Sequence, residues 1–320
     1  MKAVLLQKFG KPEALQLSEI EKPVANDDQV LIKVIAAGIN PVDAKIRSGL
    51  HSSCKDLKLP AILGKDVSGQ IEYAGGNVVD FKVGDEVFGC INGSYSEYVA
   101  ASPETIVKKP ANTSFTEAAA ISLAGLTAYQ AIHEQLGLKE GQKILIQSAA
   151  GGVGHLAVQF AKLRGAFVYG TASAKNAAFL KELGVDEVIN YKEQKFEDIA
   201  TDPDAVLDTM GGEILYRAIS IVKPGGKIVC LPSSTKDDPV AIKLAKEKNI
   251  ELIWPMMRPD KEQLQLFATL LEKKDLKVKV ESVYPLNKIV SAHKAIESHS
   301  VSGKIVLQIA GDLLQNRKSG

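Results

Sequence analysis

Between residues 143 and 254, short apolar runs alternate with stretches in which apolar residues recur at helical spacing. The apolar runs are predicted to be strands because they are too short for helices. They are Ile144–Gln147, Phe167–Thr171, Val188–Tyr191, Ala205–Thr209, Lys227–Leu231 and Glu251–Trp254. Six such strands with right-handed helical crossovers predict a doubly wound parallel sheet of the α/β class, which binds a ligand at the carboxyl ends of its strands.

The flanking regions have a different pattern. Valine-rich strand candidates at Gln29–Ala36 and Val67–Tyr73 are separated by glycine turn signals, which predicts a partly open β-barrel. Strands at Val278–Tyr284 and Ser302–Ile309, with a helix at Asn287–Ser298 between them, do not continue the parallel pattern and are expected to complete the barrel domain. We therefore expect one domain from residues 1–121 and 257–320 and a second from residues 122–256. A ligand cleft is expected between them.

A glycine-rich turn follows the first of the parallel strands, and a helix is predicted after it at His155–Arg164. Small residues at Ala149, Gly151 and Gly154 permit a tight turn and close approach of a pyrophosphate, and the helix N-terminus offers free N–H groups to an anion. The candidate cofactor-binding residues are Ala150, Gly151, Gly152, Val153 and Gly154. Because Ala149 replaces the first glycine of the usual pattern, an ordinary glycine-rich loop is the alternative.

The end of the second parallel strand indicates which dinucleotide binds. An NAD site usually carries an acidic residue there for the ribose 2′-hydroxyl, but this chain has Ser173, Lys175 and Asn176. A hydroxyl, a cation and an amide suit a 2′-phosphate, so NADPH is predicted, with Tyr191 after the next strand as a further partner. Alternatively, Lys175 is a solvated lysine at a helix start and Tyr191 a half-buried strand aromatic.

Composition limits the possible functions. The 39 basic and 38 acidic residues leave a net charge of +1, which gives no support for binding nucleic acid or an anionic membrane. No apolar segment is long enough for a signal peptide or a membrane span, so a cytoplasmic location is expected. Three widely separated cysteines fit neither a disulfide framework nor a zinc-finger spacing.

Seven motifs carry a family resemblance nearly from end to end: Asp28–Val34, Gly38–Asp43, Leu63–Gly69, Val83–Val87, Leu126–Tyr129, Ala149–Gly154 and Ser302–Val306. In this order they resemble the medium-chain dehydrogenase/reductase superfamily, in particular its zinc-free quinone oxidoreductase and enone oxidoreductase branch. The resemblance implies a GroES-like catalytic domain beside a Rossmann domain. It also implies a homodimer formed through edge strands, for which Glu251–Trp254 is this chain's candidate.

Departures from the zinc-dependent relatives are informative. Those relatives carry a ligand cysteine where this chain has Asn40 and a His-Glu pair where it has Lys65 and Asp66, and Cys90 stands alone where they have a cysteine-rich lobe. No metal is therefore predicted, and Lys65 and Asp66 are expected to form a salt bridge with each other. Without a Lewis acid, alcohol oxidation is disfavoured, whereas reduction of a quinone or an α,β-unsaturated carbonyl remains feasible.

The catalytic candidates are Asn40, Asp43 and Lys45. Asn40 and Asp43 fall in the family's cleft-lining stretch, and Asn40 is expected to offer its amide to a substrate carbonyl, with an Asx-turn before Pro41 as the alternative. Enone-reducing relatives have lysine at the position of Lys45, where many quinone oxidoreductases have tyrosine, so this residue favours an enone; a surface lysine is the alternative. His51 is a weaker candidate proton donor or a rim residue.

Four further residues are expected near the nicotinamide end of the cofactor or the cleft. Thr127 resembles the family threonine at that end of the cofactor, although a packing role is the alternative. Leu231 ends the fifth parallel strand, so its backbone is expected to border the nicotinamide ribose, and Asp208 ends the fourth and is expected to contribute there or to cap the next helix. Lys304 is expected to reach toward the cleft, with a solvated edge-strand lysine as the alternative.

Two functions from different classes follow. The first is an NADPH-dependent quinone or enone reductase with a small-molecule acceptor. The second is a non-catalytic NADPH-binding redox sensor or interaction protein that kept the cofactor fold, since fold alone does not imply function. Turnover with an acceptor distinguishes them.

Overall fold

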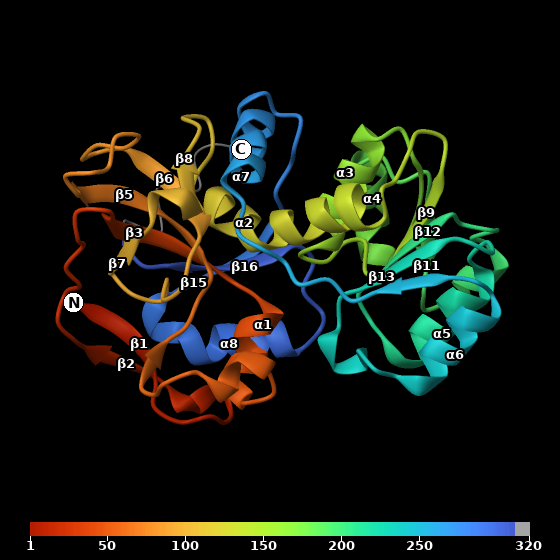
Figure 1. The fold of residues 1–320 in the computed structure, drawn as a ribbon, viewed down its shortest axis with the longest axis horizontal. Coiled ribbons are helices and arrows are strands. Elements are labelled where there is room, and N and C mark those ends of the chain that lie inside the picture. Colours follow the sequence, from red (N-terminus) through yellow and green to blue (C-terminus); the bar gives the residue numbers. More distant parts are fainter. Residues whose placement is uncertain (311–320) are drawn as a thin grey trace. The chain divides into compact units, whose positions relative to one another are not determined.

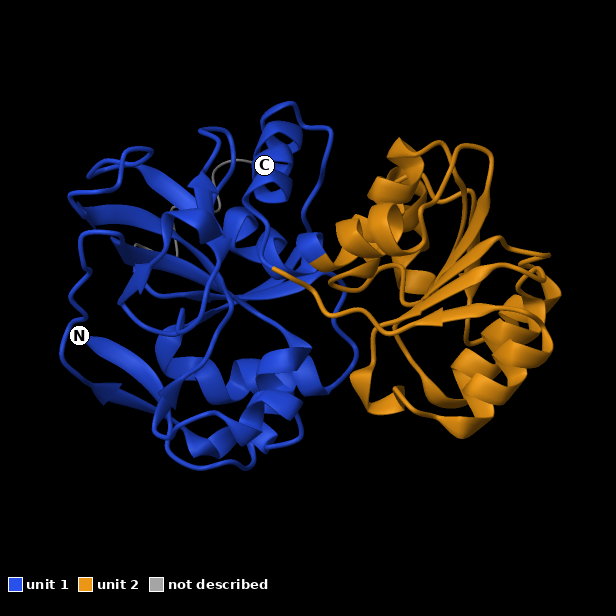
Figure 2. Ribbon diagram, viewed as in Figure 1, with its two compact units in different colours: residues 1–126, 259–320 blue, residues 127–258 orange. Residues whose placement is uncertain are grey.

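The structure is a computed structural model that describes residues 1–310, and the chain divides into two compact units. Unit 1 comprises Met1–Leu126 together with the chain from Pro259 onward, and unit 2 is the continuous segment Thr127–Arg258 (Figure 2). The division after Leu126 lies five residues beyond the expected boundary at residue 121. The second division lies two residues beyond the expected one.

Unit 2 contains a parallel sheet of six strands within the described residues (Figure 1). The strands are β9 (Lys143–Ile146), β10 (Phe167–Ala172), β11 (Glu187–Asn190), β12 (Ala205–Asp208), β13 (Lys227–Cys230) and β14 (Glu251–Ile253). Their order, β11-β10-β9-β12-β13-β14, reverses between β9 and β12, as in a doubly wound dinucleotide-binding sheet. The predicted sheet is confirmed, and every strand lies within one residue of its expected bounds.

Helices cover both faces of this sheet (Figure 1). One face carries α3 (Gly154–Leu163) and α4 (Ala177–Glu182), and the other carries α5 (Gly212–Ile221) and α6 (Pro239–Glu247). Strand residues such as Leu145, Val206 and Ile228 are buried in one cluster with residues of α5 and α6. Because the central strands are largely buried, they contain short apolar runs, which is why the pattern identified them. A π-helix at Gln130–Gln135 follows α2 (Phe115–Tyr129), and the division between the units falls within α2.

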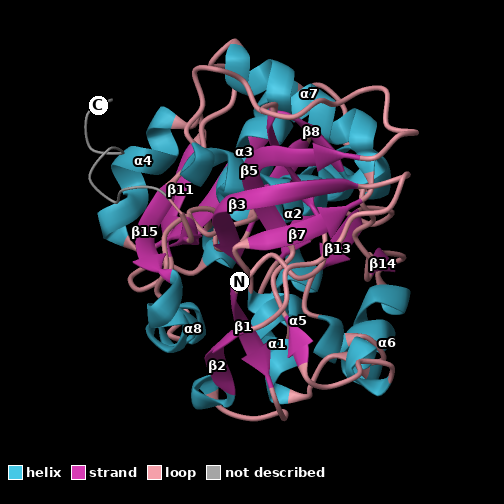
Figure 3. Cartoon of the chain, turned by 90° about the vertical axis from the view of Figure 1, so that its left-hand side faces the viewer, coloured by secondary structure: helices cyan, strands magenta, loops and turns pink. Residues whose placement is uncertain are grey.

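Unit 1 is built on a largely antiparallel sheet, which Figure 3 shows facing the viewer. Its described strands are β15 (Val280–Pro285), β16 (Lys304–Gln308), β3 (Val30–Ile39), β5 (Asp66–Ala74), β6 (Glu86–Cys90) and β8 (Ile106–Lys108), in that order, with β7 (Tyr98–Ala101) also paired to β3. A smaller sheet holds β2 (Leu15–Glu19), β1 (Lys2–Leu6) and β4 (Ala61–Ile62). The pairing of β16 with β3 incorporates the C-terminal strands into this unit, as expected.

The helices of unit 1 pack around this framework. They are α1 (Pro41–Ser48), α7 (Lys261–Glu272) and α8 (Ile289–Glu297), with the first part of α2. A buried cluster joins Val4 and Leu6 of β1 to Ile39 of β3 and Leu307 of β16. Residues that are distant in sequence therefore share one hydrophobic core, which holds the start of α1 against the sheet. Among residues 1–310, no helix combines the length and the apolar character that crossing a membrane would require.

Two glycines of unit 1 provide a matched test of this packing. A Cβ on Gly89 in β6 would lie 2.1 Å from the Thr105 carbonyl oxygen and 2.8 Å from Ile106 Cα, whereas a Cβ on Gly76 would meet no atom within 4 Å. We expect Gly89→Ala to lower the free energy of unfolding by about 1–3 kcal/mol because backbone must shift to accommodate the methyl group. Gly76→Ala should change it by less than about 1 kcal/mol. Denaturant unfolding measures both, and equal effects would contradict this packing.

Candidate functional site

The glycine-rich turn connects β9 directly to α3, as predicted. Gly151 N donates to the Ser148 carbonyl oxygen at 2.8 Å, which closes the turn, and a Cβ on Gly154 would lie 2.2 Å from that same oxygen. Only glycine fits at residue 154 without moving the turn. Val153 is the N-cap of α3, and its side chain makes no capping hydrogen bond. The groups that Ala150–Gly154 can present at the N-terminus of this helix are therefore those of the backbone. This arrangement suits a pyrophosphate.

The loops after β9 and β12 are bonded to each other where the strand order reverses. Ser148 has a positive φ of 47°, an unusual conformation for a residue with a side chain, and its N–H donates to Thr171 Oγ1 at 3.1 Å. Thr209 Oγ1 donates to the Gln147 carbonyl oxygen at 3.2 Å. Asp208 accepts hydrogen bonds from the N–H groups of Met210 and Gly211, so its carboxylate holds the loop that precedes α5.

The residues that were predicted to bind a 2′-phosphate lie in the loops after β10 and β11. Ser173 follows β10, and Lys175 lies exposed in the short helix after it. Tyr191 follows β11 with an exposed fraction of 60%, and its N–H donates to the Ala172 carbonyl oxygen at 3.2 Å. Asn176 Nδ2 lies 3.4 Å from Ser173 Oγ. The high exposure of Tyr191 excludes the alternative of a half-buried aromatic.

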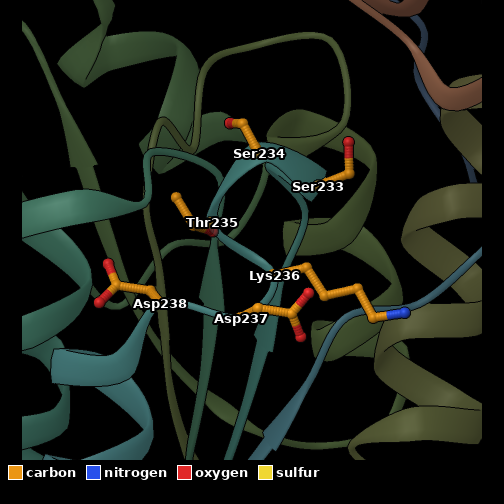
Figure 4. Close-up of a pocket in the computed structure, with 6 residues that line it drawn as sticks. All are labelled: Ser233, Ser234, Thr235, Lys236, Asp237 and Asp238. Carbon is orange, nitrogen blue, oxygen red and sulfur yellow. The ribbon is translucent and has the colours of Figure 1, made fainter.

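Leu231 follows β13, and its N–H donates to the Asp208 carbonyl oxygen at 2.8 Å. The next loop, Ser233–Asp238, lines an open pocket of about 330 Å³ (Figure 4). In this loop Thr235 Oγ1 donates to the Pro232 carbonyl oxygen at 2.8 Å, and Asp238 caps α6 by accepting from the N–H groups of Val240 and Ala241. The carboxyl end of β13 is therefore shaped by side chains that hold its loop in place.

In unit 1, Asn40, Asp66 and Lys304 meet in a buried cluster. Asn40 Nδ2 donates to Asp66 Oδ2 at 3.0 Å, and Lys304 Nζ lies 3.1 Å from the same oxygen. Lys304 Nζ also donates to Asn40 Oδ1. The exposed fractions are 2% for Asn40, 0% for Asp66 and 3% for Lys304, so water does not screen this ion pair. The alternative of a solvated edge-strand lysine at 304 is therefore wrong, because β16 lies inside the sheet.

Neighbouring backbone fixes the Asp66 carboxylate. Its Oδ1 accepts from Leu123 N at 2.6 Å. On the other side, a Cβ on Gly38 would lie 2.6 Å from Asp66 Oδ2 and 2.5 Å from the Ala119 carbonyl oxygen. Glycine at position 38 thus lets β3 approach close enough for the carboxylate to reach Asn40.

The expected salt bridge between Lys65 and Asp66 is not formed. Lys65 Nζ donates to Asn92 Oδ1, and the carboxylate of Asp66 pairs with Lys304 instead. The physical reason is that Asp66 begins β5, and successive side chains of an extended segment point to opposite sides. Adjacent residues in this segment therefore cannot pair across it.

Asp43 lies in the first turn of α1 and is 1% exposed. Its Oδ2 accepts from Asn40 N at 2.9 Å and from Tyr95 Oη at 2.8 Å, while its Oδ1 has no hydrogen-bond partner among residues 1–310. Burial is the main cause that raises the pKa of Asp43 from 3.8 to about 6. Burial and the nearby carboxylate also raise the pKa of Tyr95 well above its ordinary value.

The other unit 1 candidates are less enclosed. Lys45 is half-buried on α1. His51 lies before a short helix, where its Nδ1 is 2.8 Å from Ser53 Oγ, and burial is the first cause that lowers its pKa. In unit 2, Thr127 is half-buried near the end of α2. The roles of Lys45, His51 and Thr127 stay predictions.

Sequence reasoning missed two contributors to the cluster around Asn40. Tyr95 was not singled out, although its hydroxyl holds Asp43, and Asp66 was expected to serve only Lys65. No cluster of three or more histidine, cysteine or acidic side chains suited to a metal ion occurs in the described part of the chain.

Comparisons with known proteins agree with this architecture. Residues 26–111 match the family described as an alcohol dehydrogenase GroES-like domain, and residues 183–307 match one described as a zinc-binding dehydrogenase. The chain is 36% identical to a quinone oxidoreductase of Pongo abelii, over 96% of this chain and 97% of the relative. It is 35% identical to a 2-methylene-furan-3-one reductase of Solanum lycopersicum, over 96% of this chain and 79% of the relative.

Solved structures show the same likeness. The quinone oxidoreductase from Coxiella burnetii matches with a TM-score of 0.92 and 39% identity, over 97% of this chain and 99% of that chain. The Escherichia coli quinone oxidoreductase complexed with NADPH matches with a TM-score of 0.87 and 27% identity, over 97% of this chain and 100% of that one.

A GroES-like domain and a Rossmann-like parallel sheet together define a medium-chain dehydrogenase/reductase. The chain belongs to the quinone oxidoreductase branch of that superfamily, and its class of activity is that of an oxidoreductase.

The buried carboxyl of Asp43 predicts a pH dependence of stability. Its pKa is about 6 in the folded protein against an ordinary 3.8, so between these values the folded state holds a proton that the unfolded state has lost. Stability therefore falls as pH rises from 4 to 6, by about 3 kcal/mol in total for this group, and is level above that range. Asp43→Asn should remove this fall.

Urea unfolding of the wild type and Asp43→Asn at pH 4, 5, 6 and 7 measures the effect. As pH rises from 4 to 6, the free energy of unfolding should fall in the wild type but not in the variant, so the difference between the two should shift in favour of the variant. Parallel curves for the two proteins would show that Asp43 ionises normally.

Proposed function

We propose that the protein is an NADPH-dependent reductase that transfers a hydride to a quinone or an α,β-unsaturated carbonyl without a metal ion. The observation that carries the proposal is the grouping of Ser173, Lys175 and Tyr191 at the carboxyl ends of β10 and β11, with no acidic residue between Thr171 and Asn176. A 2′-phosphate requires positive charge and hydrogen-bond donors, whereas a free 2′-hydroxyl is usually held by a carboxylate.

The residues of unit 2 fit the rest of such a cofactor. The backbone of Ala150–Gly154 would hold the pyrophosphate at the N-terminus of α3. The backbone of Leu231 would border the nicotinamide ribose, and the hydroxyl of Thr127 would serve the nicotinamide end. NADPH supplies the hydride when it is bound.

In unit 1, Asn40 is the proposed contact to the acceptor. Asn40 Nδ2 donates one hydrogen bond to Asp66, and its second N–H is proposed to donate to an acceptor oxygen as negative charge develops there. Asp43 holds the Asn40 backbone at the start of α1 and so supports this placement. Lys45, the nearby half-buried cation, is proposed to polarise an enone oxygen.

The metal-free character of the proposal is supported by the chemistry of the cluster around Asn40. Lys304 already supplies a cation to Asn40 Oδ1 and Asp66 Oδ2, and a divalent ion beside a buried ammonium would be repelled. Elemental analysis of the purified protein should find less than about one-tenth of an equivalent of zinc. A stoichiometric amount would overturn this part of the proposal.

The first test is NADPH oxidation, followed by absorbance, with a panel of quinones and α,β-unsaturated ketones and aldehydes, and with NADH in parallel. We expect turnover with NADPH, and enones faster than quinones if Lys45 polarises the carbonyl. Asn40→Ala should lower kcat by about 100-fold, the usual effect of losing one oxyanion donor, with little change in NADPH binding. Tight NADPH binding without turnover on any acceptor would favour a redox sensor instead.

Lys175→Ala tests the choice of cofactor. Removing a cation that faces only the 2′-phosphate should weaken NADPH binding by about 10- to 100-fold and leave NADH binding nearly unchanged. Lys181→Ala is the matched control, because Lys181 lies on α4 and donates to the Asp186 carbonyl oxygen. Fluorescence titration with each cofactor gives the Kd values. Equal losses for NADPH and NADH in Lys175→Ala would exclude this phosphate site.

We also propose a cytoplasmic homodimer. β14 ends the sheet of unit 2, and a strand edge there can pair with the same edge of a second copy. Trp254 and the exposed Val240 and Ile242 of α6 lie in the same part of the sequence. Sedimentation equilibrium should give twice the monomer mass, and Leu252→Pro in β14 should shift the protein toward monomer.

A further inference from the structure

Asn40 lies between a buried cation and a buried anion, and the two together determine which way its amide faces. A lysine ammonium can only donate hydrogen bonds, so the amide atom that it contacts must be the oxygen Oδ1. A carboxylate can only accept, so the amide atom beside Asp66 Oδ2 must be Nδ2. Rotation of the amide by 180° would place donor against donor and acceptor against acceptor.

We propose that Lys304 and Asp66 are positioning residues for the reaction and that they act through Asn40. The pair locks the amide in the one orientation in which the second Nδ2–H is presented to the acceptor. This inference rests on the proposed reductase function. It assigns Lys304 to the orientation of the donor, in place of the expected contact with the cofactor.

The residues around Lys304 and Asp66 hold both side chains in place. Asp66 is held by Leu123 N at 2.6 Å, and the absence of a side chain at Gly38 keeps β3 against it. Lys304 arrives on β16, an interior strand paired with β3 through Ile305 and Ile39, which immediately precedes Asn40. A donor fixed before the substrate arrives needs no reorganisation when charge develops on the substrate oxygen, and that is the condition for strong electrostatic catalysis.

A purely structural ion pair predicts a different outcome from a positioning pair. Replacing both members of a buried pair by neutral residues of similar size often restores stability that either single replacement loses. In Lys304→Met/Asp66→Asn the fold should therefore recover. The fixed orientation of the Asn40 amide should not recover, because an asparagine at position 66 can act as donor or acceptor and a methionine at position 304 offers no donor.

The experiment compares Lys304→Met, Asp66→Asn, the double variant and Lys304→Arg with the wild type. Both single variants should lose thermal stability and kcat. The double variant should regain thermal stability but keep a kcat at least tenfold below the wild type, with the Kd for NADPH unchanged. Lys304→Arg should retain most of the activity, because arginine is also a donor only. Wild-type kcat in the double variant would show that the pair serves stability alone.

A matched control comes from another buried lysine of unit 1. The side chain of Lys109 is 4% exposed and pairs with Glu86, and its ammonium donates to the carbonyl oxygens of Pro110 and Thr113. Lys109→Met should lower thermal stability without lowering kcat once the protein is folded. A fall in kcat equal to that of Lys304→Met would indicate that loss of any buried lysine reduces activity, and it would overturn the inference.

A second measurement does not depend on turnover. The two Nδ2 protons of Asn40, identified in ¹⁵N-labelled protein by their loss in Asn40→Ala, should give separate, slowly exchanging NMR signals in the wild type. In the double variant they should exchange with solvent at least tenfold faster. An unchanged exchange rate in the double variant would refute the proposed orientation of the Asn40 amide by Lys304 and Asp66, even if the protein is an active reductase. A protein with the expected exchange but no turnover would refute the proposed function while upholding the orientation of the amide.

Discussion

The buried contact between Lys304 and Asp66 constrains the part of unit 1 where β16, β3 and β5 lie side by side. A carboxylate with no exposed surface requires compensation, and here an ammonium, an amide and a backbone N–H provide it together. The same contact joins β16 to β5 across β3. Both of its partners also bond to Asn40, the residue immediately before α1. The geometry of the candidate catalytic amide is thus a consequence of how the unit neutralises its own interior charge.

Unit 2 meets a different constraint, since the groups proposed to bind its cofactor are mainly backbone. Its parallel strands end along one edge, and short contacts such as Ser148 N to Thr171 Oγ1 and Thr209 Oγ1 to the Gln147 carbonyl oxygen hold the loops at that edge. The positive φ of Ser148 shows that the turn is maintained against a local conformational preference. In the proposed site, unit 2 would therefore offer fixed N–H groups to an anion, and unit 1 would offer a side-chain donor fixed by charge.

The sequence was most informative where local pattern and burial coincide. The six parallel strands were predictable because each has a short apolar run, and the glycine turn was predictable because residue 154 has no room for a side chain. The Lys304–Asp66 contact was not, because 238 positions separate the partners and neither residue has a local preference for the other. The Lys65–Asp66 pairing was wrong for a local reason, the alternation of side chains at the start of β5. The assignments of Asn40, Asp43, Lys45 and Thr127 to a reaction stay predictions.

The route of the chain through the two units also has a consequence for biosynthesis. Unit 2 is one continuous segment, so all of its strands are available once Arg258 has left the ribosome. Unit 1 is complete only when β16 emerges, and β16 begins 178 positions after the first segment of the unit ends at Leu126. Until then Asp66 lacks its cation and the edge of β3 that β16 will cover is open. The nascent chain must therefore keep the first segment of unit 1 from aggregating while unit 2 folds, which is the situation in which chaperones are needed.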